Sequence, residues 1–403
     1  MYYSDEILEE VRSRNDIVSV ISQYVKLTKR GGNYFGLCPF HNEKTPSFSV
    51  SPGKQMYYCF GCGAGGNVIS FIMEYESCSF TEAVRTLAER AGMTLPEAED
   101  SGEKVRSNRK NQLLEINRQA AVYYHYQLKS PAGARALAYL TGRGLTPETI
   151  QRFGLGYSLP YMDSLYKYLK QKKWDDELLR DSGLVKIDEK GVRDRFWNRV
   201  MYPIMDIRSR VIGFGGRVMG EGEPKYLNSP ETELFDKSRN LYGLHIARAS
   251  RRPYLLLCEG YMDVITLQQA GFDCAVASLG TALTPGHALL LKRYTKDVIL
   301  TYDSDGAGRN AALRALPILK NAGIDARVLS MNPYKDPDEF IRGLGAEEYE
   351  KRITAALNSF LYEMDMKRQQ YDLNDPQKKT EFHRELAARL TAFPDELERN
   401  NYL

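Results

Sequence analysis

Three cysteines and one histidine near the N-terminus have the spacing of metal ligands. They form two pairs, each with two residues between its members: Cys38 with His41, and Cys59 with Cys62. Three thiolates and one imidazole can complete a tetrahedron around zinc, and such a closed set leaves no position open for a substrate. We therefore predict one structural zinc ion at this site.

A second set of possible metal ligands lies at the ends of apolar runs in the C-terminal half. Glu259 ends the run YLLLCEG, and Asp303 and Asp305 end the run VILTYDSD. Asp336 and Asp338 follow a further run, in the stretch KDPDE. The runs alternate with helical patterns, which is typical of a parallel α/β sheet, and ligands bind such sheets beyond the carboxyl ends of the strands. The carboxylates should therefore converge.

Converging carboxylates predict metal-assisted chemistry on phosphate groups. Their hard oxygen atoms suit Mg²⁺ or Mn²⁺, and two such ions could activate a hydroxyl and stabilise a leaving pyrophosphate. Helix capping alone is an alternative role for Asp305, which precedes a helical pattern at Gly306, and for Asp263. Glu259 has no such alternative, because it lies within its apolar run.

The zinc ligands need a small domain to position them. Residues 4–25 have apolar residues at helical spacing, with Ser4 and Asp16 as candidate caps of two helices. Alternating residues around a turn at 51–54 then predict a twisted antiparallel sheet, and helical patterns return after residue 65. The segment from 96 to 112 is charged and almost free of large apolar residues, so we expect a flexible linker.

Between the two sets lies a basic stretch. Residues 193–252 carry 12 Lys or Arg against 7 Asp or Glu, which is compatible with a polyanionic partner. A helix beginning at Pro147 with Thr146 as its cap precedes this stretch, and a hairpin with its turn near Arg208 lies inside it. Glycines 213, 215 and 216 do not form the G-x-G-x-x-G pattern at a strand-to-helix turn, so we reject a dinucleotide site.

Several cations and aromatic residues are candidates for contact with nucleic acid. The loop 225–230 combines a cation, an aromatic ring and an amide, a mixture that suits a triphosphate or a strand backbone. In the N-terminal domain, aromatic residues among cations could stack on bases and bind phosphates. The alternatives are surface ion pairs for the cations and core packing for the rings. The candidates are Arg30, Lys44, Tyr58, Arg143, Arg199, Lys225, Asn228 and Lys237.

Composition limits the possible classes of protein. A chain of 403 residues with 43% hydrophobic and 27% charged residues is globular and has more than one domain. The sequence has neither a signal peptide nor an apolar run long enough for a membrane span, so we expect a cytoplasmic protein without membrane contact. Six cysteines in such a chain are read as thiols and metal ligands. Cys78, Cys258 and Cys274 are expected to be buried.

Motifs along nearly the whole chain resemble the bacterial replicative primases. CEGYMD, YDSDGAG and KDPDE resemble the Toprim site that these primases share with topoisomerases and some nucleases. GLCPFHNEKTPSFSV and YYCFGCGAGGN resemble the zinc ribbon of the family. RVMYPI, IGFGGR and PKYLNSPET resemble its polymerase core.

The resemblance implies an α+β multidomain fold with a zinc ribbon, a polymerase core and terminal helices. The implied divisions are a zinc-binding domain (1–96), a linker (97–112), a basic subdomain of the core (113–243), a parallel-sheet Toprim subdomain (244–345) and a helical subdomain (346–403).

The resemblance also implies an activity, DNA-directed synthesis of short RNA primers on single-stranded DNA. Glu259, Asp303 and Asp305 would bind two or more Mg²⁺ or Mn²⁺ ions, and Asp263, Asp336 and Asp338 would complete the acidic cluster. Arg143, Arg199, Lys225 and Lys237 would hold nucleotide phosphates or template.

The implied partners are template DNA, nucleoside triphosphates and the RNA–DNA hybrid, and we expect a monomer. Family members usually continue into a helical domain that binds the replicative helicase. Because the sequence stops at Leu403, we expect most of that module to be missing and helicase contact to be in doubt.

Two other functions remain open from the residues. A Toprim nuclease would use the same carboxylates without cations for triphosphates, and a type IA topoisomerase would need a large gate domain for which the chain has no room. A zinc-dependent single-strand binding module with an inactive Toprim fold is the non-enzymatic alternative. In that case Glu259→Gln would leave function unchanged.

Overall fold

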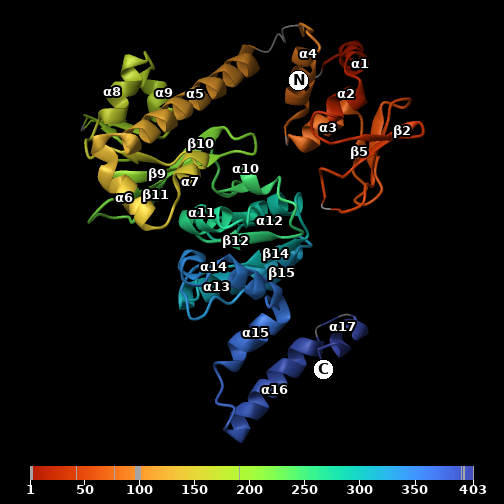
Figure 1. The fold of residues 1–403 in the computed structure, drawn as a ribbon, viewed down its shortest axis with the longest axis vertical. Helices are drawn as coiled ribbons and strands as arrows, with labels where there is room; N and C mark the ends of the chain where they lie inside the picture. The colour runs from red at the N-terminus through yellow and green to blue at the C-terminus, as the bar shows by residue number, and fades with distance from the viewer. Residues whose placement is uncertain are drawn as a thin grey trace.

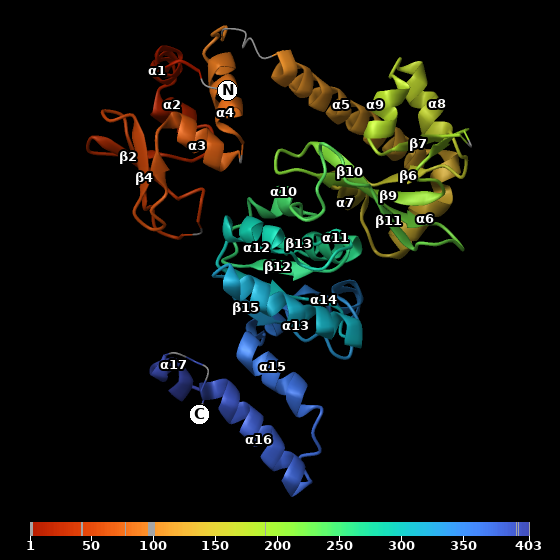
Figure 2. The ribbon, with the colours of Figure 1, turned by 180° about the vertical axis from the view of Figure 1, so that it is seen from behind.

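The computed structural model describes residues 3–41, 43–76, 78–95, 101–189, 191–391, 393 and 395–402. It confirms the predicted α+β multidomain fold (Figure 1). An N-terminal sheet domain lies beside a central part that contains two further sheets, and the C-terminal helices extend from the far end, as the view from behind also shows (Figure 2).

The N-terminal domain forms as its capping residues and alternation predict. Ser4 Oγ accepts a hydrogen bond from the Ile7 amide at 3.4 Å, and Asp16 Oδ1 accepts one from the Ser19 amide at 2.8 Å, so both helices begin at the predicted caps. The strands form one antiparallel sheet in chain order, and the aromatic rings of Phe48, Tyr57 and Phe71 fill its core. The elements are α1 (Asp5–Arg14), α2 (Ile17–Ile21), β1 (Thr28–Arg30), β2 (Asn33–Gly36), β3 (Phe48–Ser51), β4 (Met56–Cys59), β5 (Gly65–Gly66), α3 (Val68–Tyr75) and α4 (Phe80–Arg90).

The predicted linker differs from the structure. Residues 97–100 lie outside the described residues, whereas residues 101–112 form the first part of the long helix α5 (Ser101–Lys129). The charged segment is rich in Lys, Arg and Glu, which favour helices, and it continues into a buried stretch that contains Leu113, Ile116 and Ala120. Packing of that second part nucleates a helix that the first part can extend.

The basic subdomain contains a four-stranded antiparallel sheet in the order β11-β10-β9-β6, together with a separate β7–β8 hairpin. Thr146 caps α7 as predicted, with its hydroxyl accepting from the Thr149 amide at 3.2 Å. The predicted hairpin is also present, because β9 and β10 pair across a turn at residues 206–210. The elements are a 3₁₀ turn (Pro131–Gly133), α6 (Ala134–Gly142), α7 (Pro147–Arg152), β6 (Gly156–Ser158), α8 (Ser164–Gln171), α9 (Asp176–Asp181), β7 (Val185–Asp188), β8 (Gly191–Asp194), β9 (Arg199–Met205), β10 (Val211–Val218) and β11 (Tyr226–Asn228).

The glycines of β10 allow close packing. Gly213, Gly215 and Gly216 lie within the strand, away from any strand-to-helix turn. A Cβ atom at Gly215 would lie 2.5 Å from the hydroxyl of Tyr261, so only glycine allows this approach of the two subdomains.

The Toprim subdomain has the predicted parallel sheet. Strands β13, β12, β14 and β15 are parallel neighbours, and an antiparallel strand that sequence analysis did not predict, β16, pairs with β15 at the edge. Helix α14 contains a kink at Gly345, where φ is 79°. The elements are α10 (Leu244–Ala247), β12 (Leu255–Cys258), α11 (Tyr261–Gln269), β13 (Ala275–Ala277), α12 (Pro285–Lys292), β14 (Asp297–Leu300), α13 (Gly306–Asn321), β15 (Asp325–Val328), α14 (Pro337–Thr354) and β16 (Leu357–Asn358).

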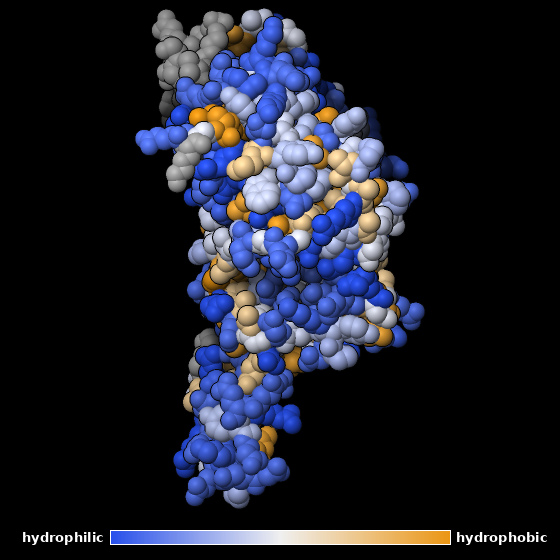
Figure 3. All heavy atoms as spheres, turned by 90° about the vertical axis from the view of Figure 1, so that its left-hand side faces the viewer, coloured by the Kyte–Doolittle hydropathy of each residue, from blue (hydrophilic) through white to orange (hydrophobic). Residues whose placement is uncertain are grey.

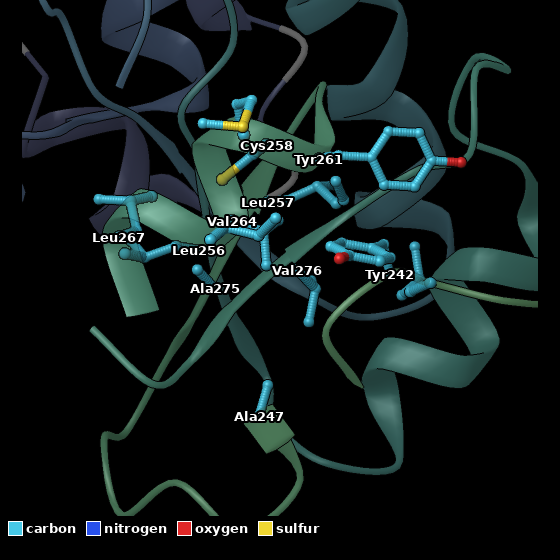
Figure 4. Close-up of a cluster of buried hydrophobic side chains, with 14 of the residues drawn as sticks. Tyr242, Ala247, Leu256, Leu257, Cys258, Tyr261, Val264, Leu267, Ala275 and Val276 are labelled. Atoms are coloured by element: carbon cyan, nitrogen blue, oxygen red, sulfur yellow. The ribbon is translucent and has the colours of Figure 1, made fainter. Parts of the chain in front are cut away.

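A continuous apolar core fixes the strand ends on which the acidic residues lie. Figure 4 shows side chains of β12, α11 and β13 packed together, among them Leu257, Val264 and Val276, and all three are fully buried. The thiols of Cys258 and Cys274 are buried as predicted, whereas Cys78 in the N-terminal domain is only half-buried.

The C-terminal helices pack through their own small apolar cluster. The ring centroid of Phe360 lies 5.3 Å from that of Phe393 and 4.6 Å from that of Tyr402, and Met364 and Leu390 complete the cluster. The predicted helical segment 381–390 lies within α16. The elements are α15 (Ser359–Arg368), α16 (Pro376–Thr391) and α17 (Glu396–Asn400).

The surface is predominantly hydrophilic on the face shown in Figure 3, where hydrophobic residues are scattered among charged ones. Within the described residues, none of the helices has both the length and the apolar character needed to cross a bilayer.

Candidate functional site

The predicted zinc ligands meet at one end of the N-terminal sheet. Cys38 and His41 lie in the loop after β2, Cys59 ends β4, and Cys62 lies in the turn before β5. One ligand atom from each lies within 4.8 Å of the others, and no other set of Cys, His, Asp or Glu in the described part of the chain meets this criterion. Cys38 Sγ and Cys62 Sγ are 3.8 Å apart, and Cys59 Sγ lies 3.6 Å from His41 Nδ1.

A carboxylate behind the ligands orients them. Glu43 Oε2 lies 3.4 Å from His41 Nε2, which leaves His41 Nδ1 directed toward the sulfur atoms. Glu43 Oε1 accepts hydrogen bonds from the backbone amides of Cys38 at 2.7 Å and Ser47 at 3.1 Å. Burial and the neighbouring Cys59 raise the pKa of the Cys38 thiol. The donor set and its geometry therefore fit a closed tetrahedral metal site.

The acidic residues gather at the carboxyl ends of β12 and β14. Glu259 follows β12, and its Oε1 accepts a hydrogen bond from the backbone amide of Asp303 at 3.1 Å. Lys335 brings a cation to the same place, since its Nζ lies 3.7 Å from Asp303 Oδ2 and 3.6 Å from Asp305 Oδ2. Glu259, Asp303 and Asp305 are therefore neighbours at this edge, but their oxygen atoms do not come within the 4.8 Å of one another that the Cys and His ligands reach.

The electrostatics of this edge show crowding of negative charge. Burial, followed by repulsion from Glu259 and Asp336, raises the pKa of Asp303 to about 6. Burial likewise raises the pKa of Glu259. Asp305 is exposed, and the Gly308 amide, which donates to its Oδ1 at 3.0 Å, lowers the pKa of this carboxyl. Hard oxygen donors in excess of the nearby cations fit Mg²⁺ or Mn²⁺.

Asp305 and two further predicted members of the cluster cap helices. Asp305 caps α13 through the Gly308 contact, so the capping role considered as an alternative is present in the structure. Asp336 caps α14, accepting from the Glu339 amide at 2.8 Å. Asp263 is buried in the first turn of α11 and accepts from the Gly260 amide at 3.0 Å. Burial and the charges of Asp336 and Asp303 raise the pKa of Asp263 well above its usual range.

Asp338 is buried, whereas a metal ligand at an open site would be accessible. Its side chain is 1% exposed and pairs with the guanidinium groups of Arg143 and Arg342, the latter at 2.9 Å. Thr266 Oγ1 also donates to Asp338 at 2.7 Å. Arg143, predicted to hold phosphates, is thereby committed to a contact that joins α6 to α14. Sequence analysis missed these buried ion pairs because Arg143 and Asp338 are far apart in the chain.

Arg199 and Asn228 are also engaged within the protein. The Arg199 side chain is buried and donates to the backbone carbonyls of Gly216 and Pro224, each at 3.0 Å. Asn228 Nδ2 donates to the Leu279 carbonyl at 2.8 Å, and its Oδ1 accepts from the Tyr261 hydroxyl at 2.7 Å. In this structure both side chains hold β-strands in place rather than face solvent.

The remaining predicted cations are more accessible. Lys225, Arg30 and Lys44 are exposed, and Lys237 is half-buried. None of these four side chains forms an ion pair with another described residue. They are therefore available for phosphate groups.

The N-terminal sheet exposes aromatic surface along β4. Tyr58 is 50% exposed and makes an edge contact with Phe60, which is 71% exposed. Tyr57 points the other way into the core, as alternation requires. Sequence analysis did not single out Phe60 or Lys335. The alternation after Met56 and the basic residue beside KDPDE were the available signals.

Comparisons with known proteins identify related domains along most of the chain. Family models match residues 3–103 (CHC2 zinc finger), 123–248 (DNA primase catalytic core, N-terminal domain), 256–341 (Toprim-like) and 362–403 (DnaB-helicase binding domain of primase).

The last of these matches corrects an expectation. The prediction that the helicase-binding module is largely missing is wrong, because the model for that domain matches residues 362–403. The error came from inferring the module's absence from the position of Leu403. Helices α15 and α16 share an apolar cluster there, together with Phe393 and Tyr402 on either side of α17.

Relatives match over most of the chain. A DNA primase of Clostridium acetobutylicum is 42% identical over 385 residues, which is 95% of this chain and 64% of that protein. The chain thus spans just under two thirds of the length of this curated relative. The crystal structure of the zinc-binding and RNA polymerase domains of the Aquifex aeolicus primase is 37% identical, with a TM-score of 0.62 over 99% of this chain and 95% of the other. A structure of a primase catalytic domain bound to single-stranded DNA is 38% identical, with a TM-score of 0.63 over 73% of this chain and 97% of the other. On these motifs, folds and similarities, the chain belongs to the bacterial DNA primase family.

Proposed function

We propose that this protein is a DNA primase that synthesises short RNA primers on single-stranded DNA. The observation that carries the proposal is the group of Glu259, Asp303 and Asp305 at the carboxyl ends of β12 and β14, with Lys335 beside it. Membership of the primase family and a related catalytic domain bound to single-stranded DNA support this assignment.

The chemistry follows from the properties of the side chains. Divalent ions held by Glu259, Asp303 and Asp305 would stabilise phosphate charge and promote attack by a 3′ hydroxyl. Lys335 Nζ, near two of these carboxylates, can pair with an incoming triphosphate. The accessible cations Lys225 and Lys237 can hold phosphates, whereas Arg143 and Arg199 act as positioning residues.

The six acidic residues do not have equal roles in this proposal. Asp263 and Asp336 lie close enough to influence the charge at Asp303, so they tune the cluster. Asp338 supports it through Arg143 and Arg342.

We further propose that Cys38, His41, Cys59 and Cys62 hold one structural zinc ion. Their close approach and the support from Glu43 favour it. Arg30, Lys44 and Tyr58 of the same domain are proposed template contacts, because cations beside an exposed ring suit single strands.

The proposed divisions follow the predicted boundaries, with one change. The zinc-binding domain (1–96), basic subdomain (113–243), Toprim subdomain (244–345) and helical subdomain (346–403) are retained, and α5 begins within the region predicted as linker. We propose nucleoside triphosphates, template DNA, an RNA–DNA hybrid and a replicative helicase as partners, and a monomeric state. The helical subdomain is the proposed helicase contact.

Incorporation of labelled ribonucleotides on unprimed single-stranded DNA tests the function. The wild type should make short RNA products with Mg²⁺ or Mn²⁺. Asp303→Ala should reduce synthesis by roughly 100-fold or more, since loss of a metal ligand costs about 3 kcal/mol of transition-state stabilisation. Asp325→Ala changes an exposed carboxylate at the opposite edge of the same sheet and should leave synthesis unchanged. Shortened template without RNA would instead indicate a nuclease, and template binding alone a binding module.

A further inference from the structure

A large cleft separates the N-terminal domain from the Toprim subdomain. Its volume is about 1880 Å³. One wall contains the loop of Cys38 and His41, and the other contains residues 247–255 and 292–295. The second wall is where β12 and β14 begin, so the cleft opens at the amino edge of the parallel sheet. The acidic residues lie at the carboxyl edge, so the cleft is separate from them.

The lining of this cleft is strongly cationic. Its side chains include seven Lys or Arg, against the two carboxylates Glu43 and Glu74. Both carboxylates are already engaged, Glu43 with Ser47 and Cys38 and Glu74 with the Tyr57 hydroxyl at 2.8 Å. No acidic residue lies on the Toprim wall of the cleft. The seven cations are Lys26, Lys44, Arg248, Arg251, Arg252, Lys292 and Arg293.

Some of these cations already interact with other side chains of the protein, and others do not. Arg252 pairs with Glu350 at 2.9 Å, and Arg248 lies over the ring of Tyr75 with its centroid 6.0 Å away. Lys292 and Arg293, at the end of α12, are exposed and form no ion pair with another described residue. Two exposed positive charges therefore lie on the wall opposite the loop of Cys38 and His41, without an ion-pair partner among the residues that the structure describes.

Contacts between the domains hold the two walls together. Arg208 in the β9–β10 turn lies 3.3 Å from the Glu76 carboxylate at the end of α3, and the Arg248 contact with Tyr75 adds a second link. Figures 1 and 2 both show the N-terminal domain beside α10 and α12. The cleft is thus formed by docking of one domain on the other.

We propose that this cleft binds a single strand of nucleic acid, with Lys292 and Arg293 contacting its phosphates. An open cationic cleft of this volume matches a chain of phosphates better than one small anion, and the half-buried ring of Phe35 on the opposite wall offers a surface to a base. The strand passes the zinc-ligand loop and the amino edge of the Toprim sheet together. The cationic cleft itself follows from the structure. That its ligand is a single strand of nucleic acid rests on the proposed function.

The salt dependence of strand binding tests the site in the full chain. Binding of a fluorescein-labelled single-stranded oligodeoxynucleotide is measured by anisotropy over a range of salt concentrations, for the wild type and for Lys292→Gln/Arg293→Gln. Each phosphate contact on a single strand contributes about 0.7 to the slope of log K against log salt, so the variant should lose about 1.4. Its affinity at low salt should fall roughly 10-fold.

A matched control removes two exposed lysines remote from the cleft. Lys172 follows α8 and Lys186 lies in β7, both on the side of the basic subdomain away from the N-terminal domain (Figure 2), so Lys172→Gln/Lys186→Gln should retain the wild-type slope. Hydrogen exchange adds an independent measurement, since the strand should slow exchange at residues 292–295 of the wild type. Equal slopes for the two double variants, or no change in exchange at 292–295, would overturn the proposal. Displacement of the strand by ATP at equal phosphate concentration would assign the cleft to free nucleotides and overturn it as well.

Primer synthesis by the same preparations separates this inference from the proposed function. If the wild type makes primers and the Lys292/Arg293 variant binds strand with an unchanged slope, only the cleft site fails. If the wild type neither makes primers nor binds the strand, the proposed function fails too.

Discussion

The zinc-ligand cluster and the acidic edge are both suited to metal ions, but the protein prepares them differently. The four ligand atoms of the first lie within 4.8 Å of one another and are supported by Glu43. At the second, Glu259 accepts a backbone hydrogen bond, Asp305 caps a helix, and Lys335 lies between Asp303 and Asp305. One site is closed by the fold, whereas the other stays open and uses its oxygen atoms for internal contacts as well.

This contrast follows from what each ion does. A structural ion contributes to folding, so its ligands must meet wherever the domain is folded. An ion that works on phosphates needs free coordination positions, which substrate and water can fill. We infer that the acidic edge gathers fully only when cations and substrate reach it, and the three predictions below test this difference.

The largest effect is expected from the closed site. Cys59→Ser removes a fully buried ligand, and zinc supplies on the order of 10 kcal/mol of folding free energy in small zinc domains. Zinc content should fall from about one ion per chain to nearly none. Amides of β2–β4 should then exchange as in an unfolded segment, while those of β12 and β14 stay protected.

Cys78→Ser is the control for this change. It alters a half-buried thiol of the same domain whose Sγ lies 3.7 Å from the Ile72 carbonyl, outside the ligand set. It should keep the zinc and the exchange protection. Normal zinc content in Cys59→Ser would show that the cluster does not hold the ion.

Local patterns in the sequence were enough to predict the closed site and most of the fold. Ligand spacing, the caps Ser4, Asp16 and Thr146, and the alternation of β4 all act within a few residues. The Toprim strands were predictable because buried runs alternate with helices. The helix over residues 101–112 was missed because packing by later residues decides it.

The roles of individual side chains at the open site depended on distant partners. Arg143 and Asp338 are 195 residues apart in the chain, yet they form one buried pair. Similarly, Asn228 meets Tyr261 and Leu279 from another subdomain. Residue type suggested phosphate or metal contact in each case, but only the tertiary fold shows which charges are already engaged.

The next largest effect is expected from Asp338. Its replacement tests whether this carboxylate stabilises the fold or binds a metal ion. Asp338→Ala leaves Arg143 and Arg342 without their shared buried partner, and breaking such a pair costs about 3 kcal/mol. The variant should unfold at lower denaturant concentration, with nearly unchanged Mn²⁺ affinity at the acidic edge by calorimetric titration. The exposed Asp372→Ala serves as control and should change neither quantity. A loss of Mn²⁺ affinity without a loss of stability would make Asp338 a metal ligand and bring the open site closer to the closed one.

The smallest effect is expected from Lys335, the cation that already lies at the open site. Lys335→Met keeps an unbranched, flexible side chain but removes its charge near Asp303 and Asp305. Because this lysine is more than half exposed, solvent weakens its interactions to about 0.5–1 kcal/mol, so Mg²⁺ should bind about two- to fivefold more tightly in the variant. The gain should shrink as ionic strength rises. Lys296→Met, an exposed lysine at the amino edge of the same sheet, should leave the affinity unchanged. Unchanged or weaker Mg²⁺ binding in Lys335→Met would mean that the lysine does not compete with the metal, and that the acidic edge is as fully arranged before metal binding as the zinc-ligand cluster.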